Sequence, residues 1–133
     1  MPSEERKPGS PGSWLRHARS DLELARIPRP AGVLYEGLCF HAQQAAEKAL
    51  KAVLIARRIP APHTHNIRSL LDLLPGDLNA PAHIQEAATL TDFAVSSRYP
   101  ADFEPIEEAE YFEAVRLAEA VVSWAEAVLR GAP

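Results

Sequence analysis

The segment FHAQQAAEKALKAVLIARR, residues 40–58, constrains the fold more than any other, because its small and apolar residues recur at helical spacing. At roughly 100° per residue, its apolar side chains share one arc of a helix, which Ala46 and Leu50 widen. That arc consists of Leu38, Ala42, Ala45, Ala49 and Val53. Alanine lets a neighbouring helix approach closely. The segment therefore predicts the central helix of a bundle, running from about Val33 to Arg58.

Two further features lie on the faces of this helix outside the alanine arc. Towards its C-terminal half almost every position is apolar, which indicates contacts on more than one side and hints at a dimer or partner surface. His41, Gln44 and Lys48 stand at i, i+3 and i+7 on the flank of the arc and form a polar edge. Two interpretations of that edge stay open. It lines a shared cleft, or Glu47 and Lys48 are solvated while the glutamines bond to neighbouring loops.

Helical spacing also marks the rest of the chain. Helices are predicted from Ser13 to about Ala25, over residues 66–74 as a short element, over residues 81–98, and from about Pro105 onwards. Proline-rich or glycine-containing breaks separate them, and no run alternates with period two over a useful length. The predicted fold class is all-α, an up-and-down bundle of four main helices plus a short helix. Residues 1–12 are predicted to be a disordered tail, and residues 13–130 a single domain.

Composition narrows the classes of function. The chain has 133 residues and a formal net charge of −4, so it lacks the global positive field of a dedicated nucleic-acid binder. Cys39 is the only cysteine, which excludes an intramolecular disulfide and favours a reducing compartment. No apolar run approaches the length of a membrane span. The chain is therefore expected to be a cytoplasmic protein without membrane contact.

Three segments together resemble the HEPN domain family: FHAQQAAEKALKAVL, then HTHNIRSLL, then SSRYPAD before a long terminal helix. The resemblance covers roughly residues 13–130, and the first segment is its most specific part. It implies a small helical bundle that forms a homodimer. It also implies a minimal nucleotidyltransferase as partner, in a two-component system that is commonly of toxin–antitoxin type. Many members of the family are metal-independent ribonucleases with an Arg, four to six residues, then His motif at the fourth or last main helix.

This chain departs from that ribonuclease motif. Metal-free RNA cleavage needs a proton shuttle and a cation, which histidine and arginine supply. Arg58 precedes His63 by four intervening residues and Arg57 precedes it by five, but this match lies in the loop after the central helix and is interpreted as coincidental. At the position that fits the family, Arg98 is followed by YPADFEPIEEAEYFEAV, which has no histidine.

Arg98 and Tyr99 are nevertheless the main candidates for a phosphate-binding site, because a guanidinium group binds phosphate and a tyrosine offers a hydroxyl and a stacking face. The predicted site for nucleotide or RNA phosphate joins them to the central helix, and Arg98 is the one weak candidate for catalysis. The full candidate set is Arg98, Tyr99, Lys48, His41 and Gln44. The alternative is structural: Arg98 pairs with Asp102 or Glu104, and Tyr99 anchors the loop to the bundle.

The histidines give no metal site. His63 and His65 form an HxH pair without a third ligand at recognisable spacing, so no metal and no cofactor are expected. His65, Thr64 or Asn66 is instead expected to cap the short helix over residues 66–74.

Three functions stay open. The first is a non-catalytic HEPN subunit that dimerises and binds a nucleotidyltransferase. The second is a ribonuclease that uses Arg98 with a substitute base. The third is a helper that binds the nucleotide substrate of the partner enzyme. The sequence favours the first function, because the histidine is missing at the expected place and the net charge is negative.

Overall fold

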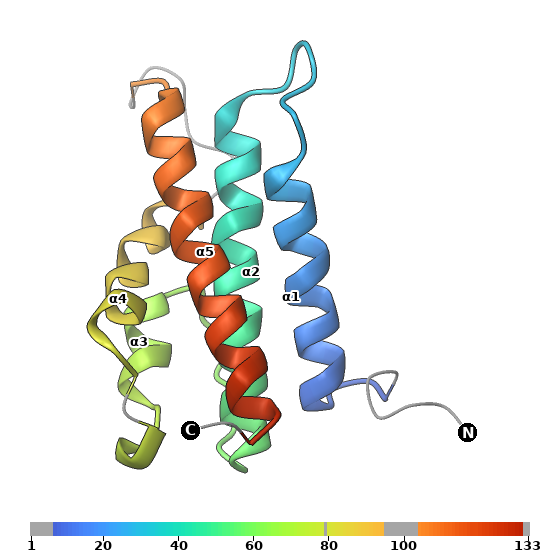
Figure 1. The fold of residues 1–133 in the computed structure, drawn as a ribbon, viewed down its shortest axis with the longest axis vertical. Coiled ribbons are helices and arrows are strands. Elements are labelled where there is room, and N and C mark those ends of the chain that lie inside the picture. The colour runs from blue at the N-terminus through green and yellow to red at the C-terminus, as the bar shows by residue number, and fades with distance from the viewer. Residues whose placement is uncertain (1–6, 79, 95–103, 132–133) are drawn as a thin grey trace.

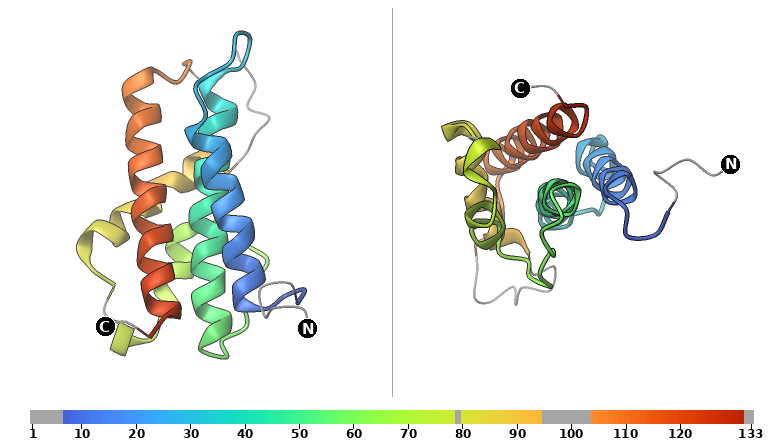
Figure 2. Two further views of the ribbon diagram at one scale, coloured as in Figure 1. Left: turned by 45° about the vertical axis from the view of Figure 1, so that its right-hand side comes forward. Right: turned by 90° about the horizontal axis from the view of Figure 1, so that it is seen from below.

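The computed structural model describes residues 7–78, 80–94 and 104–131. Three long helices dominate it: α1 (Pro11–Arg26), α2 (Tyr35–Ala56) and α5 (Glu108–Leu129). In Figure 1, α2 runs antiparallel to α1, and α5 runs in the same direction as α2. Between α2 and α5 the chain passes through short helical elements, which lie on the side of the bundle opposite α1 (Figure 2). The predicted all-α, up-and-down arrangement is therefore confirmed.

α2 is the central helix, as its alanines predicted. Viewed along the bundle in Figure 2, it lies between α1, α5 and the short elements. It packs against α1 and α5 most extensively, and also against the segment of residues 86–93. Every residue of the predicted arc is buried, and Ala42, Ala45, Ala49 and Val53 are fully so. Small side chains on this arc allow the long helices to pack closely on both sides.

The apolar C-terminal half of α2 is covered within the single chain. Leu50, Ala52, Val53 and Leu54 have no exposed surface. The prediction of a partner surface at these positions was therefore wrong, because α1, α5 and the short elements already enclose this half of the helix.

The helix predicted over residues 81–98 is not continuous. The return segment consists of α3 (Ile67–Asp72), the 3-10 turn η2 (Gly76–Leu78), α4 (Ala82–Gln85) and the 3-10 helix η3 (Glu86–Phe93). From Ile84 in α4 through η3, a row of residues spaced three apart packs in or against the core: Ile84, Ala87, Leu90 and Phe93. Three residues per turn is the period of a 3-10 helix, so this geometry keeps all of them facing the core, which a 3.6-residue period would not.

Helix ends differ from the predictions by a few residues. α1 begins at Pro11 rather than Ser13, because the Ser10 hydroxyl accepts a hydrogen bond from the Ser13 backbone at 3.0 Å and proline suits the first turn. The predicted tail thus ends earlier than residue 12, and residues 1–6 lie outside the described part of the chain. α5 begins at Glu108, three residues after Pro105, with Glu107 at its N-cap.

The end of α2 directs the chain back across its own surface. Arg58 adopts a positive φ of 61°, and the Ile59 and Arg58 amides bond to the Leu54 and Ile55 carbonyls, each at 2.9 Å. This pair of bonds is a Schellman motif, which reverses the chain direction. The following loop, residues 59–66, then lies against α2 and brings His65 to it. Across the described ranges, no helix has both the length and the apolar character needed to cross a membrane.

Candidate functional site

Asp21 on α1 joins two of the predicted site residues. Its carboxylate accepts from Lys48 Nζ at 2.6 Å and lies 2.9 Å from His41 Nδ1. The Asp21 side chain is only 10% exposed, whereas those of Lys48 and His41 are 25% and 35% exposed. The buried carboxylate therefore holds an ammonium and an imidazole at the surface and links α1 to α2.

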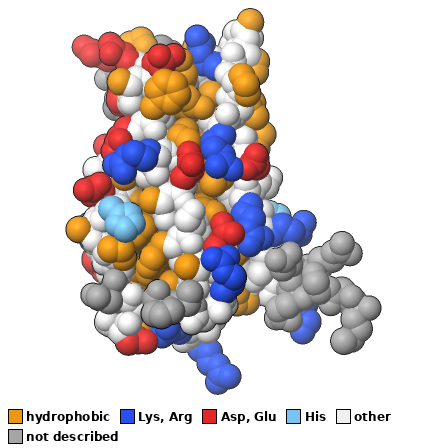
Figure 3. Space-filling view, in the orientation of Figure 1, with side chains coloured by type: hydrophobic (Ala, Val, Ile, Leu, Met, Phe, Trp, Pro, Cys, Tyr) orange, Lys and Arg blue, Asp and Glu red, His pale blue; other side chains and the backbone are white. Residues whose placement is uncertain are grey.

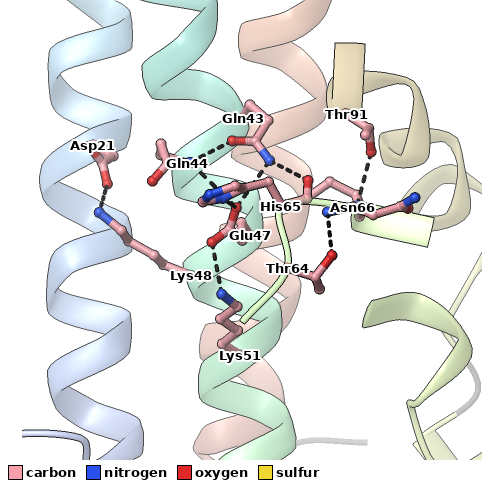
Figure 4. Close-up of polar contacts among 11 residues, drawn as sticks. Asp21, Gln43, Gln44, Glu47, Lys48, Lys51, Thr64, His65, Asn66 and Thr91 are labelled. Atoms are coloured by element: carbon pink, nitrogen blue, oxygen red, sulfur yellow. Dashed lines mark hydrogen bonds and ion pairs between the residues drawn. The ribbon is translucent and has the colours of Figure 1, made fainter. Parts of the chain in front are cut away.

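Glu47, the residue before Lys48, is the centre of a second cluster, which is more deeply buried (Figure 4). Its carboxylate accepts from Lys51 Nζ at 2.9 Å, from Gln43 Nε2 at 3.2 Å and from Gln44 Nε2 at 3.4 Å. His65 Nδ1 lies 2.8 Å from the same carboxylate. Lys51 in turn lies 5.5 Å from the centroid of the Trp14 ring. Glu47 is thus neutralised by a buried lysine and bonded on both oxygens. The interpretation of Glu47 as a solvated residue was wrong.

The loop that carries His65 is held in place on both sides of that residue. Gln43 donates to the His65 backbone carbonyl at 2.9 Å. The Asn66 side chain caps α3 by accepting from the Ser69 amide at 3.1 Å, and Thr91 accepts from the Ile67 amide at 2.9 Å. Asn66, one of the three predicted caps, is therefore the cap of the short helix. The imidazole of His65 itself remains 66% exposed.

Within the described part of the chain, these contacts leave an accessible line along α2, which we call the α2 stripe. Its members are exposed or partly exposed, in a helix that is otherwise largely buried: Gly37, Phe40, His41, Gln44 and Lys48. The predicted polar edge of His41, Gln44 and Lys48 is therefore brought together on one surface. Phe40 adds an aromatic ring beside His41, with ring centroids 5.6 Å apart.

Arg98 and Tyr99 lie outside the described residues, so their predicted place beside α2 stays a prediction. Sequence reasoning missed the residues that organise the site: Asp21, Glu47, Lys51 and the imidazole of His65. A weak local signal existed for one pair, because Glu47 and Lys51 have the i, i+4 spacing of a helical ion pair. Asp21 is 20 residues from His41 and 27 from Lys48, and His65 is 18 residues from Glu47. No local pattern reveals contacts over such separations.

The site consists of carboxylates, ammonium groups, amides and imidazoles that are joined by hydrogen bonds. Among the described residues, every buried side-chain nitrogen and oxygen has a partner. In the same part of the chain, no group of three or more His, Cys, Asp or Glu residues is placed to hold a metal ion. Imidazoles that are held by carboxylates, as His41 and His65 are, can bind polar groups and transfer protons.

Comparison with known proteins agrees with the helical architecture. The family model described as HEPN domain matches residues 12–128. TT1696 from Thermus thermophilus has a similar structure with 34% sequence identity and a TM-score of 0.75, over 89% of this chain and 97% of that one. ST0689, an archaeal HEPN homologue, is 33% identical with a TM-score of 0.70, over 88% of this chain and 95% of that one. A search of curated proteins returned no match. The family model spans most of the chain and both solved structures share the bundle, so this protein belongs to the HEPN domain family.

Proposed function

We propose that this protein is a HEPN subunit that forms a homodimer and pairs with a minimal nucleotidyltransferase in a toxin–antitoxin-type system of the cytoplasm. The observation that carries this proposal is the α2 stripe. It is the accessible line that the described residues leave on a helix whose other faces are mostly enclosed by the chain itself. Its polar groups are fixed by the buried carboxylates of Asp21 and Glu47, and binding surfaces depend on side chains that are held in position in this way.

In this proposal, two copies meet along the stripe, with Phe40 as the apolar contact and His41, Gln44 and Lys48 lining the cleft between them. Leu24, which is 42% exposed, lies one turn beyond Asp21 on α1 and extends the apolar part of this surface. Arg98 and Tyr99 complete the cleft as the phosphate-binding groups.

Sedimentation of the purified protein tests the dimer. Phe40→Asp should convert the dimer to a folded monomer, because a charge at the centre of an interface costs desolvation energy. Phe112→Asp is the matched control, since Phe112 is 59% exposed on α5 and is no part of the stripe. A wild-type monomer at micromolar concentration would refute the dimer. Co-expression with a minimal nucleotidyltransferase from the same genome should give a complex that survives purification. If the protein were a nucleotide-binding helper instead, ATP or GTP would raise its melting temperature with concentration.

The Glu47–His65 contact favours a second candidate, a metal-independent ribonuclease. The carboxylate at Nδ1 favours the imidazole tautomer that carries its hydrogen there, which leaves Nε2 as a base at the exposed side of the ring. His65 would then be the substitute base that the sequence did not reveal. Nε2 would take the proton of a ribose 2′-hydroxyl, the 2′-oxygen would attack the adjacent phosphorus, and the 5′-oxygen would leave with a proton from water.

Cleavage of single-stranded RNA in the presence of EDTA tests this candidate. His65→Asn keeps a side-chain N–H for Glu47 but removes the base, so it should abolish cleavage while the fold is retained. His63→Asn changes an exposed histidine of the same loop and should cleave normally. In the same assay, Arg98→Ala should abolish cleavage if Arg98 stabilises the charged phosphorane. Cleavage that persists in His65→Asn would exclude His65 as the base.

A further inference from the structure

A pocket that shares only Lys48 with the α2 stripe lies where the N-terminal turn meets the start of α1. Its volume is about 300 Å³, at the lower end of the range for small-molecule sites. Three parts of the chain line it: the turn before α1, the first two turns of α1, and α2. The lining residues are Pro8, Gly9, Ser13, Trp14, His17 and Lys48.

The walls of this pocket are held in place by hydrogen bonds. The Ser10 amide donates to the Lys7 carbonyl at 3.1 Å, which closes the turn that carries Pro8 and Gly9. The Ser10 hydroxyl caps α1 by accepting from the Ser13 amide at 3.0 Å. The turn and the helix start therefore form one unit, so the pocket is preorganised and a ligand need not order it.

Trp14 gives the pocket a flat aromatic wall. The indole is half-buried and packs against the core. Lys51 contacts the same ring at 5.5 Å from its centroid, but Lys51 is buried and is not among the residues that line the pocket. The ring is thus fixed from the side of the bundle, and it offers surface to a second ring from the side of the pocket.

Basic residues are frequent near the start of α1 in a chain that is acidic as a whole, and one of them, Arg19, is paired with Glu126 at 3.4 Å. Residues 7–20 include Lys7, Arg16 and Arg19 and contain no aspartate or glutamate. Figure 3 shows several Lys and Arg side chains close together on the right of the lower half of this face, with an acidic side chain among them, and further acidic side chains at the upper left. Lys48 adds an ammonium group with three N–H donors to the pocket, and its hydrogen bond to Asp21 uses one of them.

We propose that this pocket binds a small aromatic anion, with a flat ring against Trp14 and a phosphate or carboxylate at Lys48 and His17. A single chain forms the pocket, so the proposal depends neither on the dimer nor on a nucleotidyltransferase. Asp21 already compensates the charge of Lys48 at 2.6 Å, so an anion without a ring gains little there. A ring without an anion makes no use of the N–H donors of Lys48 that Asp21 does not occupy. Both parts of the ligand are therefore required.

The fluorescence of Trp14 can report binding directly. The chain has two tryptophans, so Trp124→Phe leaves Trp14 as the single indole. The probes are phenyl phosphate and adenosine 5′-monophosphate, with phenol as the ring alone and inorganic phosphate as the anion alone. We expect saturable changes in fluorescence with the two phosphorylated rings, and affinities roughly tenfold or more weaker with phenol and with phosphate.

Two substitutions in the Trp124→Phe background then test the role of Lys48, with circular dichroism as the check of folding. Lys48→Met should weaken the phosphorylated probes roughly tenfold, and Asp21→Asn should strengthen them several-fold because it releases the charge of Lys48. Arg16→Met is the matched control, since Arg16 is an exposed cation on α1 that does not line the pocket. An equal loss in Arg16→Met would indicate diffuse attraction and overturn the proposal. It would also be overturned if fluorescence did not change at millimolar probe, or if phosphate bound as tightly as phenyl phosphate.

Discussion

Nδ1 of His65 lies 2.8 Å from the Glu47 carboxylate, although the imidazole is 66% exposed and the carboxylate only 3% exposed. A buried acid thus controls the orientation of a surface base. The same relationship recurs on the other side of α2, where Asp21 is 2.9 Å from the partly exposed His41. Each carboxylate also binds a lysine, Lys51 or Lys48, so neither charge is left uncompensated.

Removing Glu47 should destabilise the fold strongly. Glu47→Ala leaves the Lys51 ammonium buried without its counter-ion, which costs about 3–5 kcal/mol. The double variant Glu47→Leu with Lys51→Met replaces the pair by apolar side chains of similar size. Its cost should be far below that of Glu47→Ala, because no charge remains to be desolvated. Urea denaturation measures both free energies of unfolding. A cost below about 1 kcal/mol for Glu47→Ala would contradict the burial of this pair.

Replacing His65 separates its anchoring role from its chemistry. His65→Ala removes one donor from the Glu47 carboxylate and should lower the free energy of unfolding by about 1 kcal/mol. His65→Asn restores a donor at the Nδ1 position and should recover most of this loss. His63→Ala should stay within about 0.5 kcal/mol of wild type, as expected for an exposed loop residue. Chemical denaturation of the four proteins side by side provides the comparison, and an equal loss in His65→Asn would mean that the imidazole ring itself is needed.

Arg58→Gly should stabilise the protein. Arg58 occupies the left-handed position of the Schellman motif at the end of α2, with φ of 61°, where a side chain costs about 1 kcal/mol and glycine does not. Thermal unfolding should show a higher Tm. Arg57→Gly is the control: Arg57 has a φ of −95° and binds Asp77 at 2.8 Å, so glycine there should lower the Tm. If Arg58→Gly lowered the Tm as well, strain at this position would be disproved.

Tyr111→Phe should destabilise the contact between α5 and α1. The phenol donates to the Ala25 carbonyl at 2.5 Å in a buried site, and without it that carbonyl loses a partner, at a cost of about 1–2 kcal/mol. Tyr35→Phe is a useful control, because its hydroxyl bonds the exposed side chain of Glu108 at 3.0 Å and should matter less. Hydrogen exchange of α1 and chemical denaturation at neutral pH measure the effect.

The same residue should make stability fall at alkaline pH. Burial raises the pKa of the Tyr111 phenol, so the folded state favours the neutral form. The resulting stabilisation is complete below the ordinary phenol pKa of about 10 and is lost as pH rises through the higher pKa of the folded state. In Tyr111→Phe the decline above about pH 10 should be shallower than in wild type. Denaturation midpoints across this range decide the matter, and parallel curves would rule out a contribution from Tyr111.

The sequence by itself determined the helical class, the central position of α2 and the arc that α2 buries. These are properties of residue spacing along one helix, and Ala42, Ala45 and Ala49 are buried as that spacing predicts. It also placed His41, Gln44 and Lys48 on a common edge. The resemblance of three segments was enough to identify the family that the comparison later confirmed.

Only the tertiary structure decided which polar residues are buried and what they contact. Glu47 has the same local pattern as a solvated helical residue. It is enclosed because the chain after Arg58 turns back and lies across it, which sets the Glu47–His65 contact over 18 residues of sequence. The 3-10 geometry of η3 could not be predicted for a similar reason. The three-residue spacing of its apolar residues favours a 3-10 helix only when a core lies on one side of the segment. Whether a residue is buried depends on which distant segments of the chain pack over it. Burial changes the free energy of a charged group far more than the helix propensity of the residue does.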